Sequence, residues 1–528
     1  MTRRTAWAGV VAALGAAVCL ARPAAAQTPG GLRERTLYED LQLFSQVLNQ
    51  IRVNHPDAIV PHTLFLAAVE GMVRAADPHS YVIPAARLSA EKEKALRAGK
   101  LHPVAIQFAF IDGAPVVVGV APGSAAARQD ILPGDELLRI DDAPVAAASD
   151  EELQIALAGP RGAPVRLLLE RHRADGSLVK LERSVARERV EEASVVPAAF
   201  AWDDSTGYVR VTSFASVRAA DELHAALGRL EKQGMRRLIL DLRGNGGGSV
   251  AEAAQVAGEF LPARTVVYTS AGRKPEVADT GRVQRSFWAQ ERRYPLVLLI
   301  DGATASAAEL VAGALQDHDR ALVVGRPSFG KALLMQGFPM ADGSVIMLVI
   351  GHVRTPCGRV IQRQYQGVSR RSYYRLGLAE RDTVGRPSCQ TRTGRRVYGG
   401  GGIFPDLLLP AAEAAAPWVE RVREASLPIQ WASGYAEVHA ASVATAEELA
   451  ARPALPDAAL AAFRAFARSR GVAVPTDPAA DERLQRLLVA TVAAARWGEA
   501  GYYRVVAAFD PDVRAAVAAL PRAAELAR

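Results

Sequence analysis

The sequence predicts an α/β protein in which a core with a parallel sheet follows a mostly β segment and lies between helical regions. Three observations predict this class. Short aliphatic runs alternate with helical periodicity in residues 191–410, as in strands joined by crossover helices. Short runs separated by turn residues fill residues 99–188. Residues 33–75 have apolar positions at helical spacing, and residues 411–528 are rich in Ala, Leu and Arg with proline breaks.

The length of 528 residues and an apolar fraction of 50% allow several domains, each with its own core. The formal net charge is +7, and residues 1–26 contribute three arginines and no acid, so their removal leaves +4. This balance gives no reason to expect a nucleic-acid partner.

The amino terminus has the order of a secretory signal. Arg3 and Arg4 precede an apolar segment over residues 6–21, and three alanines at 24–26 come before Gln27. We expect cleavage after residue 26 and export to the periplasm or cell envelope. The segment is short for a membrane span. An uncleaved anchor is the alternative, and it is the one way in which we expect this chain to contact a membrane.

After cleavage the chain keeps two cysteines, Cys357 and Cys389. An even count in an exported chain predicts a disulfide, which would close a loop of about thirty residues and stabilise the fold by about 3–4 kcal/mol. Two unpaired thiols are the alternative. Neither cysteine has the spacing of a metal site, and we expect no metal and no cofactor.

The helical region at 33–98 should hold two amphipathic helices broken near Pro56. The β segment that follows should hold strands at 105–110, 115–120, 136–140, 165–170 and 178–184. Asp-Gly turns at 112 and 175 separate strands, and Ser149 should cap a helix that runs to about residue 158.

The core region at 191–410 should hold buried strands at 207–213, 238–242, 295–300 and 321–324. Asp241 and Arg243, at the end of the second strand, are expected to pair with each other. The glycines that follow, up to Gly248, let backbone N–H groups approach a ligand. A phosphate loop is the alternative, and the missing Walker lysine weakens it.

Ser306 should open a helix directly after the strand at 295–300. A helix start leaves backbone N–H groups unpaired and favours an anion beside it. Lys331 is flanked by apolar residues that would lower its pKa and let it act as a base toward a serine. The alternative is structural, because Ser306 and Glu309 have the spacing of a capping box, and a lone lysine is usually a solvated surface group.

The strings ATASAAELVAGALQD at 303–317 and GRPSFGK at 325–331 resemble the carboxyl-terminal processing peptidases, the tail-specific family of Ser/Lys proteases. The resemblance implies a ClpP/crotonase-like fold for the core. It implies Ser306 as nucleophile and Lys331 as general base. The oxyanion would be held by the amides of Ala307 and of Gly247 or Gly248.

The same resemblance implies three supporting residues. The family has a glutamine four positions after the lysine, but position 335 is Met335 here and the glutamine is Gln336. A β-bulge could turn Gln336 toward Lys331, as an orienter of the base. Glu309 and Asp317 match family positions and are expected to brace the site.

The strings PGSAAA at 122–127 and LPGDELLRID at 132–141 resemble a PDZ domain, which we place at 99–188. Such domains take up a peptide carboxyl terminus as an added strand. The loop for the carboxylate falls on Pro103, Val104, Ala105 and Ile106, where proline lacks an N–H donor. The domain should therefore bind tails weakly or act as a lid over the site, and a purely structural module is the alternative.

An enlarged loop at 363–397 holds nine arginines, and it is either a solvated excursion or an exosite for acidic partners. The helical region at 411–528 shows no catalytic constellation, so packing or partner binding is expected there.

The resemblance implies an exported serine endopeptidase that cleaves protein substrates near their carboxyl termini. The expected partners are substrate tails and an activating adaptor. A PDZ-bearing scaffold without activity, with Ser306 as a helix cap, is the first alternative. A Ser/His/Asp hydrolase using His318 or His352 is the second, and the absence of a Gly-x-Ser-x-Gly elbow weakens it.

Overall fold

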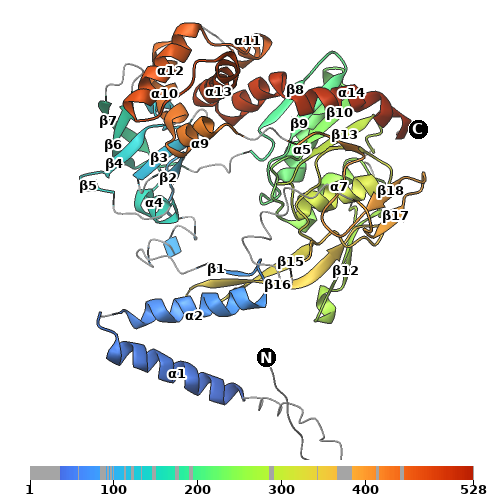
Figure 1. The fold of residues 1–528 in the computed structure, drawn as a ribbon, viewed down its shortest axis with the longest axis horizontal. Coiled ribbons are helices and arrows are strands. Elements are labelled where there is room, and N and C mark those ends of the chain that lie inside the picture. The colour runs from blue at the N-terminus through green and yellow to red at the C-terminus, as the bar shows by residue number, and fades with distance from the viewer. Residues whose placement is uncertain are drawn as a thin grey trace, which may run out of the picture. The chain divides into compact units, whose positions relative to one another are not determined.

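The computed structural model describes residues 36–526, apart from 58, 84–90, 92–93, 96–97, 99, 112–113, 121–123, 133, 146–149, 173–177, 189–193, 285–290, 342, 366–382, 412–414 and 440–444 (Figure 1). The predicted signal segment, the Asp-Gly turns, the cap at Ser149 and most of the enlarged loop lie outside these residues. The chain divides into two units, Met1–Val69 and Glu70–Arg528.

Two helices follow the described amino terminus, α1 (Leu37–Asn54) and α2 (Pro61–Ala76), with the expected break between them. Thr36 and Glu39 form a capping box that starts α1. The rings of Phe44 and Phe65 pack edge to face with centroids 6.5 Å apart. α1 has no buried residue, so its apolar face is exposed in this structure. The helical periodicity predicted the helix but does not identify a segment that packs against this face.

The expected strands of the PDZ segment are present. They are β2 (Ile106–Ile111), β3 (Ala114–Val120), β4 (Glu136–Ile140), β6 (Pro164–His172) and β7 (Leu178–Ala186), in the order β2-β3-β4-β6-β7, with β5 (Ala143–Pro144) on β4. The 3₁₀ turn η1 (Ala127–Gln129) and helix α4 (Asp150–Leu157) complete the segment. Arg171 is buried and pairs with Asp135 at 2.7 Å. Among the described strands, β2 and β7 stand at the two edges of this sheet.

A six-stranded sheet forms the centre of the core, in the order β19-β14-β13-β10-β9-β8. Its strands are β8 (Ala198–Ala201), β9 (Thr206–Arg210), β10 (Arg237–Asp241), β13 (Leu296–Ile300), β14 (Leu322–Gly325) and β19 (Leu407–Leu408). All neighbouring strands are parallel except β8 and β9, so the prediction of a parallel sheet with crossover helices is confirmed. The carboxyl ends of β10, β13 and β14 therefore meet at one edge.

Helices cover both faces of this sheet. α5 (Ala219–Lys232), α6 (Val250–Gly258) and α7 (Ala307–Asp317) share one apolar core with Leu240 and Leu298. The alternate residues Ile239 and Val297 pack instead with α14 (Pro511–Leu526). Figure 1 shows α7 and α14 beside these strands. The last helix of the chain is thus part of the core.

A second sheet lies in the same unit. Its order is β1-β16-β11-β12, and β15 also pairs with β16. The strands are β1 (Tyr81–Ile83), β11 (Val266–Gly272), β12 (Asp279–Arg282), β15 (Leu333–Pro339) and β16 (Val345–Arg354), with the 3₁₀ turn η2 (Pro275–Val277) after β11. The register between β15 and β16 shifts between Leu334 and Met335, where a bulge was expected.

The helices of the carboxyl-terminal region are α9 (Pro417–Glu424), α10 (Leu427–Val438), α11 (Ala446–Ala451), α12 (Asp457–Ser469), α13 (Pro478–Phe509) and α14. The first five share a core around Trp431 and Phe463, and α13 is kinked at Gly498. α10 contacts β6. Gly134, at φ +98°, lies so close that an added Cβ would be 2.6 Å from the carbonyl oxygen of Ile429. In the described part of the chain, no helix combines the length and apolarity that a bilayer crossing requires.

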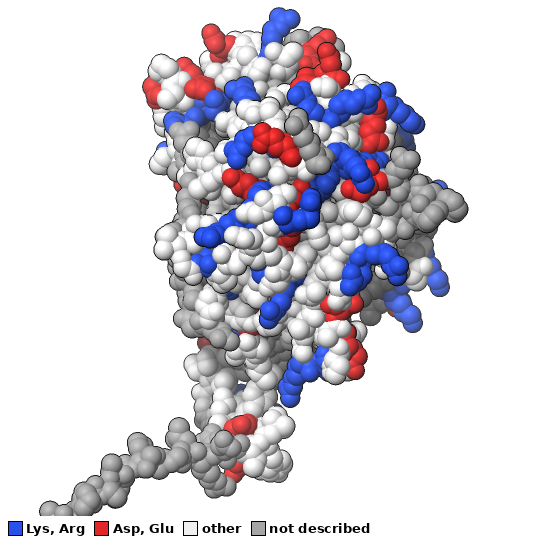
Figure 2. Space-filling view, turned by 90° about the vertical axis from the view of Figure 1, so that its right-hand side faces the viewer, with Lys and Arg blue, Asp and Glu red and all other residues white. Residues whose placement is uncertain are grey.

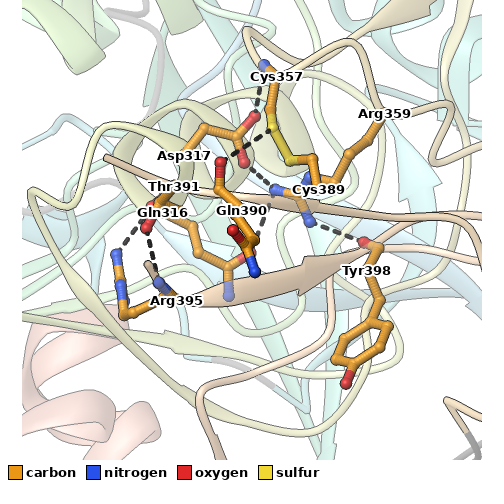
Figure 3. Close-up of a disulfide and its surroundings, with 9 residues drawn as sticks. All are labelled: Gln316, Asp317, Cys357, Arg359, Cys389, Gln390, Thr391, Arg395 and Tyr398. Carbon is orange, nitrogen blue, oxygen red and sulfur yellow. Dashed lines mark hydrogen bonds and ion pairs between the residues drawn. A yellow bond between two sulfur atoms is a disulfide. The ribbon is translucent and has the colours of Figure 1, made fainter. Parts of the chain in front are cut away.

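The structure joins Cys357 and Cys389 in a disulfide (Figure 3). The N–H of Cys357 donates to Asp317 Oδ2 at 2.9 Å, and Arg359 forms an ion pair with the same carboxylate. Cys389 belongs to a hairpin of β17 (Ser388–Gln390) and β18 (Arg396–Tyr398). Asp317 thus holds the disulfide loop and hairpin at the carboxyl end of α7, the end opposite Ser306.

On the face drawn in Figure 2, basic side chains stand among acidic ones. Only residues 363–365 and 383–397 of the enlarged loop are described, so the prediction of an exosite there falls mostly outside the structure.

Candidate active site

Ser306 lies in the turn between β13 and α7, as predicted, and its backbone conformation is unusual. It has φ 56° and ψ −121°, a left-handed region that residues with a side chain rarely occupy. Such a conformation costs about 1–3 kcal/mol and persists where the surroundings enforce it, often at active sites. Sequence patterns give no signal for this strain.

The glycine loop after β10 packs directly against Ser306. A Cβ added to Gly247 would lie 2.8 Å from both Ser306 Cβ and the amide nitrogen of Ala307. Gly247 has φ +97°, so the loop needs glycine here both for conformation and for space. The N–H of Ala305 donates to the carbonyl oxygen of Asn245 at 2.9 Å, which fastens the loop to the turn.

The amides near Ser306 are not equally available. The N–H of Gly247 donates to Asn245 Oδ1 at 2.9 Å. Among the hydrogen bonds of the described residues, none uses the N–H of Gly248 or of Ala307. Of the two glycines predicted from the sequence, Gly248 is therefore the one whose N–H can donate to a new partner. The role of Asn245 in occupying Gly247 was not visible in the sequence.

Glu309 connects the two residues expected to react. Its side chain is fully buried, and its Oε2 accepts the backbone N–H of Ser306 and that of Lys331, each at 2.8 Å. Its Oε1 accepts the N–H of Gly330 at 2.7 Å and the hydroxyl of Ser328. One carboxylate oxygen thus holds the backbones of Ser306 and Lys331 close together. Burial raises the pKa of Glu309 to about 7, although these hydrogen bonds act to lower it.

The hydrogen bonds of the described residues do not include one between the Ser306 hydroxyl and the Lys331 amine. The Lys331 side chain is partly buried, and this loss of solvent lowers its pKa. The charges of Asp77 and Glu309 act in the opposite direction.

Asp77 was not singled out in the sequence. Its Oδ1 accepts the N–H groups of His79 and Ser80, both at 2.7 Å. The hydroxyl of Ser80 accepts the N–H of Val349, on β16, at 3.0 Å. This turn carries the carboxylate of Asp77 into the electrostatic environment of Lys331.

Gln336 is exposed on β15, where it pairs with Leu348 after the bulge. The described hydrogen bonds include none from Gln336 to Lys331. Another glutamine, Gln362, accepts the N–H of Ala332 at 2.8 Å. Gln362 was missed because nothing in its spacing linked it to the lysine.

Gln336 lines a cavity of about 460 Å³. Its apolar wall comes from side chains of α6, β11, η2, β15 and β16, namely Val250, Tyr268, Val277, Leu334 and Ile350. Val250 starts α6 just after the glycine loop, and β15 follows Lys331 closely. The cavity therefore adjoins both loops of the candidate site, where a substrate side chain could enter.

The predicted PDZ loop at residues 103–106 leads into β2, which begins at Ile106. Val104, Ala105 and Ile106 are buried, and the carbonyl oxygen of Pro103 accepts the N–H of Glu188 at 3.2 Å. The side chain of Gln154, on α4, donates to the carbonyl oxygen of Ile106 at 3.2 Å. A side chain of α4 thus already occupies the carbonyl of the first residue of β2, an edge strand of the sheet.

In the described hydrogen bonds, neither histidine of the alternative hydrolase mechanism contacts Ser306. His318 follows the last residue of α7, about 18 Å from Ser306 along the helix axis, and contacts the carbonyl oxygen of Val266 at 2.8 Å. His352 is exposed on β16. Neither arrangement offers a base to Ser306, so this alternative is not supported. Where the chain is described, its acidic, histidine and cysteine side chains form no cluster suited to a metal ion.

Comparison with known proteins defines the class. Residues 205–370 match peptidase family S41, and residues 116–171 match the PDZ domain. The fold and the matches thus describe a serine-type peptidase that carries a PDZ domain. Both matched segments lie inside the regions predicted for them.

Similar proteins are named carboxyl-terminal-processing proteases, after the family that the sequence motifs resemble. A carboxy-terminal-processing protease of Bartonella bacilliformis is 29% identical over 62% of this chain and 74% of its own length. A carboxyl-terminal-processing protease of Synechocystis sp. is 35% identical over 44% of this chain and 53% of its own length. The matched part of this chain therefore spans about half of the second relative. A solved photosystem II D1 C-terminal processing protease aligns with 69% of this chain and 86% of its own, at 22% identity and a TM-score of 0.35.

Residues 205–370 of this chain are thus similar to peptidase family S41, and the resemblance to the carboxyl-terminal processing peptidases that the sequence predicted is confirmed. The scaffold without activity is correspondingly not favoured.

Proposed function

We propose that this chain is a Ser/Lys endopeptidase that cleaves protein substrates near their carboxyl ends. One observation supports the assignment of the dyad above all others: a single buried oxygen of Glu309 accepts the backbone N–H of both Ser306 and Lys331. An ordinary capping glutamate serves its own helix start, whereas this one also fixes the residue that would be the base.

The proposed reaction uses this chain's own groups. The Ser306 hydroxyl attacks the substrate carbonyl while the neutral Lys331 amine takes its proton, and the resulting ammonium later protonates the leaving amine. The amides of Gly248 and Ala307 would hold the oxyanion, and each such donor typically lowers the barrier by about 3 kcal/mol. Partial burial of Lys331 supports the neutral amine, because it lowers the pKa.

The proposal includes an activating step. The serine and lysine side chains are not hydrogen-bonded to each other in the described residues, and catalytic hydrogen bonds often tighten only when substrate binds. Binding of a substrate tail, or of an adaptor, would bring the two groups into contact. The strained backbone of Ser306 and its neighbouring glycine loop are the elements that such binding would adjust.

Tail recognition is assigned to the PDZ segment. The open edge of β2 can accept an added strand, but Gln154 occupies the carbonyl of Ile106 and Pro103 lacks a donor. We therefore propose weak tail binding that displaces Gln154. The predicted boundaries at 99–188, 191–410 and 411–528 are part of this proposal.

Export to the periplasm or cell envelope also stays a proposal. It rests on the amino-terminal pattern, and the bacterial and chloroplastic origins of the similar processing proteases are consistent with a location outside the cytoplasm.

The test is digestion of an unfolded test protein prepared with several different carboxyl-terminal residues. Ser306→Ala and Lys331→Ala should each abolish cleavage. The matched controls are Thr445→Ala, which removes the cap of α11, and Lys232→Ala, at the end of α5, and both should cleave at close to the parent rate. Cleavage that survives Ser306→Ala would overturn the proposal. A parent protein that binds tails without cleaving would instead support the scaffold.

A further inference from the structure

Six charged side chains form a cluster beside the candidate site. This arginine–aspartate cluster comprises Arg210, Arg243, Arg326, Asp241, Asp510 and Asp512. Its members come from the ends of β9 and β10, from the loop after β14, and from the junction between α13 and α14. The cluster therefore joins the carboxyl edge of the parallel sheet to the last two helices of the chain.

Arg243 is the member that belongs to the glycine loop. Its Nη2 lies 2.7 Å from Asp241 and 2.8 Å from Asp510, and its Nη1 lies 3.1 Å from Asp512. Arg210 donates to the carbonyl oxygen of Arg243 at 2.6 Å. The backbone at the start of the glycine loop is thus fixed from the sheet side and from the side of the last helices.

Arg326 is the member that belongs to the loop leading to Lys331. It forms a two-pronged pair with Asp512, with Nη1–Oδ2 at 2.6 Å and Nη2–Oδ1 at 3.1 Å. Its Nε donates to the carbonyl oxygen of Pro410 at 2.7 Å, and its own N–H donates to that of Ile300 at 3.1 Å. Paired forks of this kind fix direction as well as distance.

Asp512 is the only one of the three aspartates that contacts both Arg243 and Arg326 in the described ion pairs. It is 8% exposed and sits in the first turn of α14, where its N–H donates to Asp510 Oδ1 at 2.8 Å. Val513 and Leu520 bury the same helix against the sheet. The carboxylate is therefore anchored by packing that does not depend on the ion pairs.

We infer that Asp512 is a positioning residue for peptide cleavage, because it sets the placement of the Gly248 amide relative to Lys331. The inference rests on the proposed roles of Gly248 and Lys331. Arg243 leads into the loop that ends at Gly248, and Arg326 leads into the loop that delivers Lys331. A carboxylate that clamps both arginines fixes the separation between the oxyanion donor and the base.

The expected effect falls on the chemical step. A misplacement of about 1 Å at a reacting centre can slow a reaction about 100-fold. Loss of an interaction that matters only in the transition state lowers kcat and kcat/KM equally. We therefore expect Asp512→Asn to lower kcat by about 10- to 100-fold with KM changed less than about twofold. A residue that only stabilises the fold would lower the active fraction and leave the kcat per folded molecule unchanged.

The experiment compares Asp512→Asn with a matched control, Asp319→Asn, in the full chain. Asp319 is also buried, at 2% exposed, and pairs with Arg395 at 2.8 Å, but it precedes β14 at the opposite edge of the sheet. Both variants should lose comparable thermal stability, and only Asp512→Asn should lose kcat per folded molecule. Asp512→Glu, which keeps the carboxylate, should recover part of the loss.

The inference would be overturned if folded Asp512→Asn kept the kcat of the parent protein. It would also be overturned if Asp319→Asn lost as much kcat as Asp512→Asn. If Asp512→Asn does not fold, Arg326→Lys carries the test, because lysine keeps the charge and loses the planar fork. Activity in Ser306→Ala would refute the proposed function itself. An inactive Ser306→Ala together with a fully active Asp512→Asn would refute only the positioning role.

Discussion

Replacing Glu309 by glutamine tests the contact on which the proposed dyad depends. Glutamine keeps the size of the side chain but turns one acceptor oxygen into an NH₂ donor. That group must face either the N–H groups of Ser306 and Lys331, or the N–H of Gly330 and the hydroxyl of Ser328. The second orientation leaves fewer groups unpaired, because a hydroxyl can also accept.

The size of the effect follows from this count. In the better orientation one buried N–H, that of Gly330, loses its acceptor, which costs about 1–3 kcal/mol. Either orientation weakens the hold on the loop that carries Lys331. We therefore expect Glu309→Gln to lower the free energy of unfolding by about 1–3 kcal/mol and to lower kcat by about 100-fold.

The assay measures kcat on an unfolded test protein, normalised to the folded fraction, and urea unfolding. The matched control is Glu252→Gln. Glu252 occupies the same position in the Ser-x-x-Glu start of α6, is buried, and accepts the N–H of Ala220 at 3.1 Å, but contacts no residue of the proposed dyad. The Glu252→Gln variant should be less stable than the parent protein and should keep the parent kcat. An equal loss of kcat in both variants, or none in Glu309→Gln, would refute the reasoning.

Four further predictions concern charge, the disulfide and backbone strain. Because burial raises the pKa of Glu309 from 4.5 in the unfolded chain to about 7, the folded protein binds the extra proton between these values, so the free energy of unfolding should fall by about 3 kcal/mol as pH rises from 4.5 to 7. Since the charge of Asp77 raises the pKa of Lys331, Asp77→Asn should move the rising limb of kcat/KM against pH to lower pH. Cys389→Ser should lower stability by about 3–4 kcal/mol, measured by urea unfolding. Gly134→Ala should cost more than the about 1–3 kcal/mol of backbone strain, because its Cβ would meet a carbonyl oxygen.

Each of these has its own control. The pH dependence of stability should disappear in Glu309→Gln, and its persistence would mean that another group titrates. Asp203→Asn, in the turn after β8, should leave the pH profile of cleavage unchanged. A reductant should destabilise the parent as much as Cys389→Ser and should not affect that variant. Gly162→Ala has similar strain at φ +79° but open space, so equal costs at Gly134 and Gly162 would argue against the clash.

The sequence predicted the core well because its buried strands are short apolar runs, and β9, β10 and β13 are each followed by a helix. The strand at 295–300 and the helix after Ser306 agree with β13 and α7 to within a residue. The parallel pairing of these strands follows from this alternation, since parallel strands need crossover connections. The position of Ser306 at a helix start was thus accessible from local pattern alone.

The parts of the site that could not be predicted depend on contacts between distant segments. Asp77 and Asp512 lie far from Lys331 in the chain and carry no local signature of their roles. The occupation of the Gly247 amide by Asn245 and the strained φ of Ser306 are properties of the folded backbone, which residue types do not encode locally. The carboxyl-terminal region was expected only to pack or to bind partners, yet its last helix supplies the clamp on both loops.

The most direct test of the account is covalent labelling with a fluorophosphonate, followed by digestion and mass spectrometry to locate the modified residue. We predict that Ser306 alone is modified, that the rate rises with pH as Lys331 loses its proton, and that Lys331→Ala abolishes the reaction. Modification of a different serine, or an unchanged labelling rate in Lys331→Ala, would contradict the pairing of this hydroxyl with this amine.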